Sequence, residues 1–148
     1  MLVNLEIVSP ERLLLSRPVD MVVIPASEGD MGVLEGHAPA IVMLRGGIIA
    51  LYEGERVTDQ MYVAGGFAEV TPERCTVLAD EAISPDTLDR GAIEADLQVV
   101  EGNLPSLREQ VARATDTDRE RLLIELHRLE REQAVLQAKL QALGETTH

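Results

Sequence analysis

Two hydrophobic patterns divide this chain. Up to residue 83, apolar residues alternate with polar ones in short runs, and each run ends at a glycine, a proline or a charged turn. Alternation with a period of two is typical of half-buried β-strands. The runs lie at 4–7, 12–15, 19–24, 41–44, 48–52, 56–58, 61–64, 67–71 and 75–79. Short strands with turns at this spacing predict an all-β sandwich or flattened barrel rather than a parallel α/β sheet.

Residues 27–39, which read SEGDMGVLEGHAP, interrupt this series of runs. Gly29, Gly32 and Gly36 allow turns with positive φ, and Pro39 fixes the direction in which the chain leaves. The segment is therefore predicted to be a shaped loop between strands. Such a loop usually presents a surface to a partner.

The pattern changes at residues 82–86, beyond which Ala, Leu, Glu, Gln and Arg dominate. Apolar residues then recur in steps of three and four on either side of a polar break at 114–118, which predicts two helices packed as an antiparallel hairpin. The first series is Ile93, Leu97, Val100, Leu104, Leu107 and Val111, and the second is Leu122, Leu126, Leu129, Gln133, Leu136, Leu140 and Leu143. We therefore predict an N-terminal β-sandwich domain over 1–83 and a C-terminal α-helical hairpin over 86–144.

Several residues predict where these helices begin and end. Ser84, with Asp86, is expected to cap the first helix beside Pro85. Thr117 lies three residues before Glu120, the spacing of a capping box. Gly144 is expected to follow the end of the second helix. Pro105 should kink or split the first helix near Gly102 and Asn103.

Composition and charge narrow the classes of partner. A chain of 148 residues, 45% of them apolar, can form one good core with an appendage. Its net charge of −13 disfavours direct binding to nucleic acid or to an anionic membrane surface and favours a partner with basic patches. Cys75 is the only cysteine and is expected to be a small buried core residue in a reducing compartment. No stretch approaches the roughly 20 apolar residues of a membrane span, and no signal peptide is expected.

Catalytic patterns are scarce. His37 has Asp30 and Glu35 as neighbours in the sequence, but their spacing matches no metal-ligand pattern, so a structural or contact histidine is the preferred interpretation. His127 and His148 are expected to be exposed. Gly65 and Gly66 lack the remaining residues of a phosphate-binding loop and predict a bulge or tight turn. The chain is therefore predicted to be a binding or mechanical part, not an enzyme, with no cofactor and no metal.

Three stretches, taken in this order, resemble one family. They are LEIVSPE (Leu5 to Glu11), IPASEGDMGVLEGHAP (Ile24 to Pro39) and YVAGGFAEVTPERCTVLADEA (Tyr62 to Ala82), and a helical hairpin follows them. This succession closely resembles the epsilon subunit of bacterial F-type ATP synthases. The resemblance covers nearly the whole chain, and it implies a ten-stranded β-sandwich followed by a two-helix hairpin.

The resemblance also implies a role and partners. It implies a subunit of the central stalk, or rotor, of a proton-translocating ATP synthase, which couples rotation of the c-ring to ATP synthesis through the gamma subunit. The expected place is the cytoplasmic face of the bacterial inner membrane, with the membrane reached only through the complex. The hairpin is expected to extend along gamma toward the catalytic alpha and beta subunits and to regulate or inhibit ATP hydrolysis.

Individual residues take roles from the same resemblance. Asp30, Gly32 and His37 match positions that face the polar loops of the c-ring, and an acidic Asp30 suits a cationic ring loop. Ser9 and Val42 match positions that face gamma.

The family's ATP-binding motif in the hairpin is matched only in part. Leu88 and Asp89 fit it, but Ala92 and Ile93 stand where the motif has Arg and Ala. Arg90 is out of register by two, which places it on another face of a helix. ATP binding is therefore disfavoured.

Inhibition by the hairpin is expected to be weak. The basic residues of its second half are interspersed with glutamates, which dilute any contact with acidic surfaces. The basic residues are Arg119, Arg121, Arg128, Arg131 and Lys139, and the glutamates are Glu120, Glu125, Glu130 and Glu132.

Two other classes remain open from the sequence. One is a stand-alone ligand-binding β-domain, such as a small jelly roll that uses His37 and Asp30 on a metal. The other is a scaffold whose hairpin pairs with a second copy of itself through the leucine seam.

Overall fold

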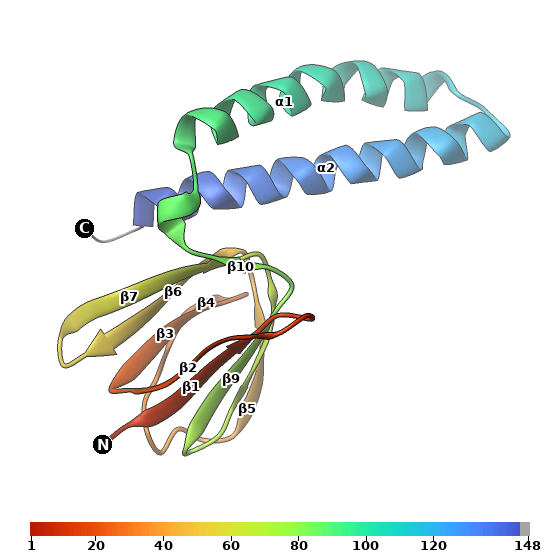
Figure 1. Ribbon diagram of the computed structural model, residues 1–148. Helices are drawn as coiled ribbons and strands as arrows, with labels where there is room; N and C mark the ends of the chain where they lie inside the picture. The colour runs from red at the N-terminus through yellow and green to blue at the C-terminus, as the bar shows by residue number, and fades with distance from the viewer. Residues whose placement is uncertain (146–148) are drawn as a thin grey trace. The chain divides into compact units, whose positions relative to one another are not determined.

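The computed structural model describes residues 1–145, with the side chains of residues 1–144, and the expectation for His148 lies outside this range. The chain separates into two compact units. The first unit comprises Met1–Leu88 together with the chain from Gln141 onward, and the second comprises Asp89–Leu140. Figure 1 shows the elements of both.

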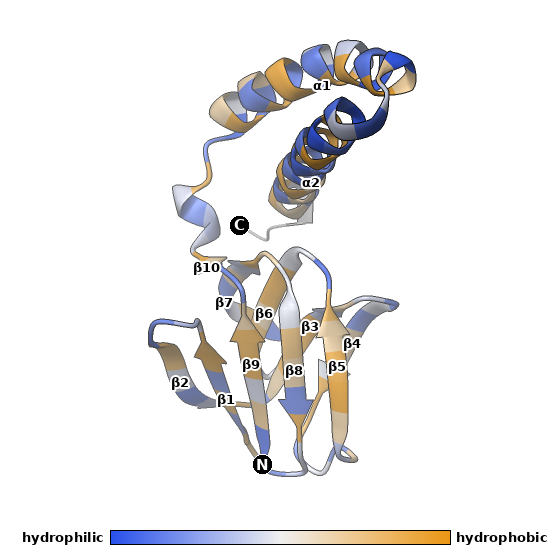
Figure 2. Cartoon of the chain, turned by 90° about the vertical axis from the view of Figure 1, so that its right-hand side faces the viewer, coloured by the Kyte–Doolittle hydropathy of each residue, from blue (hydrophilic) through white to orange (hydrophobic). Residues whose placement is uncertain are grey.

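The first unit holds ten β-strands, which confirms the predicted all-β domain. They are β1 Val3–Val8, β2 Leu13–Val19, β3 Met21–Ala26, β4 Gly29–Val33, β5 Ala40–Leu44, β6 Gly47–Glu53, β7 Arg56–Val63, β8 Gly66–Val70, β9 Arg74–Ala79 and β10 Ala82–Ile83. The strands lie in the order β10-β7-β6-β3-β5-β8-β9-β1-β2, and β4 pairs with β3 outside this path. The pairs are antiparallel except β1 with β9, and the sheet curls into a sandwich (Figures 1 and 2).

The alternating pattern explains the core of this domain. Along β1, the side chains of Val3, Leu5 and Ile7 are fully buried, whereas Asn4 is exposed and Glu6 is partly exposed. Successive residues of a strand point to opposite faces of the sheet, so alternation in the sequence becomes an apolar interior. Cys75 is buried in this core, as predicted, and burial raises the pKa of its thiol to about 11.

Three details of the strands differ from the prediction. Residues 29–33, predicted as loop, form β4, because Gly32 pairs with Val23 of β3. Residues 56–63 form the single strand β7 rather than two pieces. The strand β2 continues through Pro18 to Val19, and its place at the end of the strand order allows a proline, which lacks an N–H to donate.

A second, smaller buried cluster completes the first unit. It joins Ile48, Tyr62 and Ala142, and Leu88 packs against it. The Tyr62 ring is fully buried, and within the described residues its hydroxyl has no hydrogen-bond partner. Burial, followed by the nearby charge of Glu81, raises the pKa of Tyr62 to about 12.

The helices are α1, Arg90–Arg113, and α2, Asp116–Glu145, which confirms the predicted hairpin. The pairs Arg108 with Glu130 (3.6 Å) and Glu101 with Gln133 (3.5 Å) give the two helices an antiparallel register. Most of the predicted stripe of α1 is buried, including Val100 and Leu104. Within the described residues, neither helix combines the length and the apolar character needed to cross a membrane.

Four predictions about the ends and the course of the helices were wrong. Ser84 precedes only the short 3₁₀ helix η1, Pro85–Thr87, and its side chain makes no cap; the N-cap of α1 is Asp89, which accepts a hydrogen bond from the Ala92 N–H (3.2 Å). The second helix begins at Asp116, so Thr117 lies within its first turn instead of capping it. Gly144 lies inside α2 rather than after it.

The fourth of these predictions concerns Pro105, which does not split α1. A proline removes one backbone donor and leaves the carbonyl four residues earlier, at Glu101, without its helical partner. Glu101 and Pro105 are both exposed. Water can therefore bind that carbonyl, and the helix continues.

Candidate partner-binding surfaces

The turn between β3 and β4 is held in place by Arg45. Its guanidinium donates to Asp30 Oδ1 (2.6 Å) and to the Ala26 carbonyl (2.7 Å). The Arg45 N–H also donates to the Pro25 carbonyl (3.0 Å), and the Ser27 N–H donates to the Met43 carbonyl (2.8 Å). The predicted contact residue Asp30 thus lies at the start of β4, directly after a fixed turn, with its charge partly balanced by an arginine.

His37 lies in a different turn. Gly36, with φ of +86°, donates its N–H to the Pro72 carbonyl (2.7 Å), and His37 Nδ1 lies 2.8 Å from the Ala38 carbonyl. This turn adjoins the end of the sheet where Ala40 pairs with Val70. The Asp30 turn adjoins the other end, where Leu44 pairs with Gly66 and with Ala26.

The structure therefore places Asp30 and His37 at opposite ends of β5. A five-residue strand spans roughly 15 Å. Gly32 lies between them in sequence, exposed on β4. The proposed contact set for the c-ring is spread over strand β4 and the turn of His37 rather than gathered at one spot.

The two residues predicted to face gamma differ in orientation. Ser9 forms a tight turn with Arg12 through two backbone hydrogen bonds (2.9 and 3.3 Å), and this turn lines a shallow hollow of about 340 Å³ with Asp80 and Glu81. Val42 is half-buried and packs against the sandwich core. Its neighbours Ile41 and Met43 are the exposed residues of β5.

Ile41 and Met43 were not singled out from the sequence as surface residues. The alternation of β5 could have found them, since it predicts that one of each adjacent pair faces outward. It could not say which of the two faces is covered.

The residues at the position of the ATP-binding motif stabilise the fold of this chain. Asp89 caps α1, Leu88 packs on the small cluster around Tyr62, and Ile93 is buried. The carboxylate of Asp89 is therefore already engaged with a backbone N–H. Among the described residues, no group of three or more His, Cys, Asp and Glu side chains is placed to hold a metal ion.

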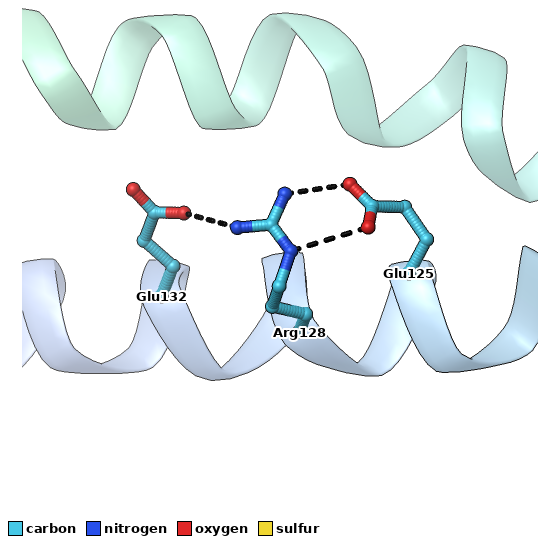
Figure 3. Close-up of polar contacts among 3 residues, drawn as sticks. All are labelled: Glu125, Arg128 and Glu132. Atoms are coloured by element: carbon cyan, nitrogen blue, oxygen red, sulfur yellow. Dashed lines mark hydrogen bonds and ion pairs between the residues drawn. The ribbon is translucent and has the colours of Figure 1, made fainter.

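Four arginines of the hairpin are paired with its own acids. Arg128 binds Glu125 through two hydrogen bonds (2.6 and 3.2 Å) and lies 3.7 Å from Glu132, as Figure 3 shows. The hydrogen bond from Arg128 lowers the pKa of Glu125, and the same bond raises the pKa of Arg128. Further ion pairs join Arg108 to Glu130, Arg113 to Glu109 and Arg121 to Asp118.

Known proteins share both parts of this chain. The family model of the ATP synthase delta/epsilon chain β-sandwich domain matches residues 2–85. The ATP synthase epsilon chain of Granulibacter bethesdensis is 73% identical over 79 residues, which are 53% of this chain and 58% of that one. The ATP synthase epsilon chain of Rhodospirillum centenum is 45% identical over 141 residues, which are 94% of this chain and 90% of that one.

A solved structure shares the fold over most of the length. It is a chain in the Euglena gracilis mitochondrial ATP synthase, determined as OSCP/F1/c-ring in rotational state 1. The match has a TM-score of 0.60 and 25% identity, and it covers 91% of this chain and 81% of that one.

Proposed function

The chain belongs to the epsilon chains of F-type ATP synthases and is a central-stalk subunit, and from this premise we propose that it couples c-ring rotation to ATP synthesis through gamma. It does so as a non-catalytic part, and the bonds of ATP are made in other subunits. Its place is the cytoplasmic face of the bacterial inner membrane, reached through the complex. The observation that carries the proposal is the 45% identity to an epsilon chain over 94% of this chain, because it spans the sandwich and the hairpin together.

The β-sandwich suits a part that transmits torque. A curled sheet whose core side chains are fully buried resists deformation, since close-packed interiors have low compressibility. In this proposal Asp30, Gly32 and His37 contact the c-ring, and Ser9 and Val42 lie toward gamma. The hydrogen bonds of Arg45 support the contact of Asp30 with the c-ring, because they fix the turn directly before Asp30.

The hairpin acts as a weak regulator of ATP hydrolysis. Gripping the acidic surfaces of the alpha and beta subunits would need free basic side chains, whereas Arg108, Arg113, Arg121 and Arg128 are paired with carboxylates of the hairpin itself. Each such pair must be broken before its arginine can bind elsewhere. The partly matched motif at Leu88 and Asp89 takes no ATP.

Two strains test the coupling and the regulation separately. One lacks the whole chain, and the other ends the chain before residue 86. Inverted membrane vesicles of each are assayed for ATP synthesis and hydrolysis. We expect the full deletion to abolish coupled synthesis, and the truncation to keep synthesis while hydrolysis rises by no more than a few fold. Normal synthesis without the chain would contradict the coupling role, and a rise of many fold on truncation would show the hairpin to be a strong brake.

A further inference from the structure

The apolar seam of the hairpin has a polar residue at its middle. On α2, Gln133 takes one position of the stripe and has three leucines on either side. They are Leu122, Leu126 and Leu129 before it and Leu136, Leu140 and Leu143 after it. Of the six apolar residues in the stripe of α1, three end at Val100 and three begin at Leu104. We call residues 93–100 with 136–140 the base block, and residues 104–111 with 122–129 the tip block.

The polar residue lies at the level of Glu101 on the facing helix. Gln133 donates a hydrogen bond from Nε2 to Glu101 Oε2 at 3.5 Å, which is long for such a bond. Figure 1 shows α1 and α2 running side by side, and the ion pair of Arg108 with Glu130 joins them on the tip side of this contact. Gln133 is half-buried in the seam, so it separates the leucines of the two blocks.

The backbone of α1 is weakened at the same level. Pro105 has no N–H, so the Glu101 carbonyl lacks its helical hydrogen bond. Gly102 has open space around it, so no neighbouring atom requires a glycine there. Glycine and proline are the residues least favourable inside a helix, and Asn103 is also a poor helix former. Of residues 101–105, only Leu104 is buried.

These features coincide in one cross-section of the hairpin. A segment opens locally where it has few buried apolar contacts and exposed backbone hydrogen bonds. Residues 101–105 have both properties, and the side chain opposite them is an amide instead of a leucine. Opening one block therefore breaks few contacts of the other, and the two blocks can unfold separately.

The ends of the two blocks differ. Beyond the base block, α2 continues into the first unit, where Ala142 is 1% exposed in the cluster with Tyr62. At its other end the base block follows the N-cap of α1, Asp89. The tip block ends at a two-residue connection and at Asp116, whose φ of +49° is unfavourable for a residue with a side chain. The tip block is therefore the one expected to open first.

We propose that residues 101–105 and Gln133 form a joint, at which the tip block opens while the base block stays packed. Opening the tip exposes the apolar residues of half the seam while Ala142 stays buried in its cluster. The hairpin then regulates ATP hydrolysis from this half-open state, a step that rests on the proposed function and makes it specific.

Hydrogen exchange of the full-length chain tests the joint. In the wild type, amides of the tip block should exchange at least about tenfold faster than those of the base block, after correction for intrinsic rates. The joint variant, Gly102→Ala with Pro105→Ala, restores the missing donor and should reduce this ratio to about twofold or less. Gln133→Leu should also reduce it. The control Gln137→Leu makes the same change at an exposed position outside the seam and should leave the ratio unchanged.

Two results of the exchange experiment would overturn the joint. One is a tip block that exchanges as slowly as the base block in the wild type, since the hairpin would then open as one unit. The other is a ratio that stays the same in the joint variant, since the difference between the blocks would then have another origin.

Inverted membrane vesicles test the half-open state. The joint variant should hydrolyse ATP nearly as fast as the strain whose chain ends before residue 86, because its tip block can no longer open. Hydrolysis at the wild-type rate, in vesicles where truncation raises it, would overturn the half-open state as the regulatory one. If truncation itself leaves hydrolysis unchanged, the proposed regulation is wrong and the half-open state has no regulatory role. The exchange ratio decides the joint in either case.

Discussion

The sandwich and the hairpin bury their apolar residues to different depths. In the sandwich, Leu5, Ile24 and Ile49 are wholly inaccessible to water. In the hairpin, Leu104 keeps 2% of its surface exposed, and Val111, Leu126 and Leu129 each keep 8 or 9%. A curled sheet encloses its side chains with strands from distant parts of the sequence. A helix pair can cover each stripe only with the other stripe. The same kinds of residue therefore stabilise the two regions unequally.

Leucine truncation gives the largest expected contrast. Leu5→Ala should destabilise the sandwich by about 3 kcal/mol or more, because it leaves a cavity in a closed core. Leu129→Ala should cost the hairpin about half as much, since water reaches the site and the helices can close around it. The two tyrosines lie in the sandwich and the chain has no tryptophan, so tyrosine fluorescence follows the sandwich and far-UV circular dichroism follows the hairpin in urea titrations. Equal losses would show that the hairpin seam is as tightly packed as the core.

Replacing a glycine by alanine should have opposite effects on stability in the two regions. Gly66 has φ of +118°, and a Cβ there would collide with the Leu78 carbonyl and Ala79 Cα. Gly66→Ala should therefore destabilise the sandwich by about 2 kcal/mol or more. Gly102 lies in α1 with open space around it, so Gly102→Ala should stabilise the hairpin by about 0.5–1 kcal/mol. Thermal unfolding of both variants measures the difference, and a stabilising Gly66→Ala would contradict the strained backbone.

These contrasts explain what the sequence could predict. Strands with one buried face and helices with one apolar stripe were predictable, because burial on one side makes apolar residues recur in the sequence with the period of the strand or helix. The strand β4 was not, because GDMGV has two glycines and no alternation, and its strand form comes from pairing with β3. The start of the first helix was misplaced because two residues near it have capping chemistry: Asp89 caps α1 through a local hydrogen bond from the Ala92 N–H, whereas Ser84 precedes only a 3₁₀ turn.

The candidate sites were less predictable than the fold. The resemblance could point to residues around Ser9, Asp30 and Val42, but only strand register shows that Val42 faces the core and that Met43, Phe67 and Leu78 form one line. These three residues are far apart in the sequence. The pairing of Arg45 with Asp30, fifteen positions away, has no signal in either residue's neighbourhood.

The Tyr62 hydroxyl offers a smaller test, confined to the first unit. Tyr62→Phe removes a buried hydroxyl that lacks a partner within the described residues, so it should stabilise the sandwich by about 1 kcal/mol near neutral pH. The pKa of Tyr62 is raised by folding from 10.0 to about 12, so the folded state favours the neutral form. That preference is fully present below pH 10 and is lost as the pH rises toward 12.

The variant should therefore lose less stability than the wild type between pH 10 and pH 12. Cys75, whose pKa is also raised, contributes equally to both chains. Tyr52→Phe, on the neighbouring strand β6 and only partly buried, serves as the control. Identical unfolding midpoints for wild type and Tyr62→Phe across this range would show that the hydroxyl reaches water or a partner.

The smallest expected effect lies in the exposed charges of the hairpin. Replacing Glu125 and Glu132 together by Gln leaves Arg128 without its two carboxylates (Figure 3). Exposed ion pairs add little to stability, so unfolding of the hairpin should hardly change. The freed guanidinium can then bind an acidic surface of the catalytic head, and inhibition of ATP hydrolysis should deepen by about twofold at low salt. Adding Arg128→Gln to the double variant should remove this gain, because the gain requires the arginine. If hydrolysis responds equally with and without Arg128, the ion pairs within the hairpin do not limit its regulation of hydrolysis. The difference between the sandwich and the hairpin then concerns their structure and not the regulation.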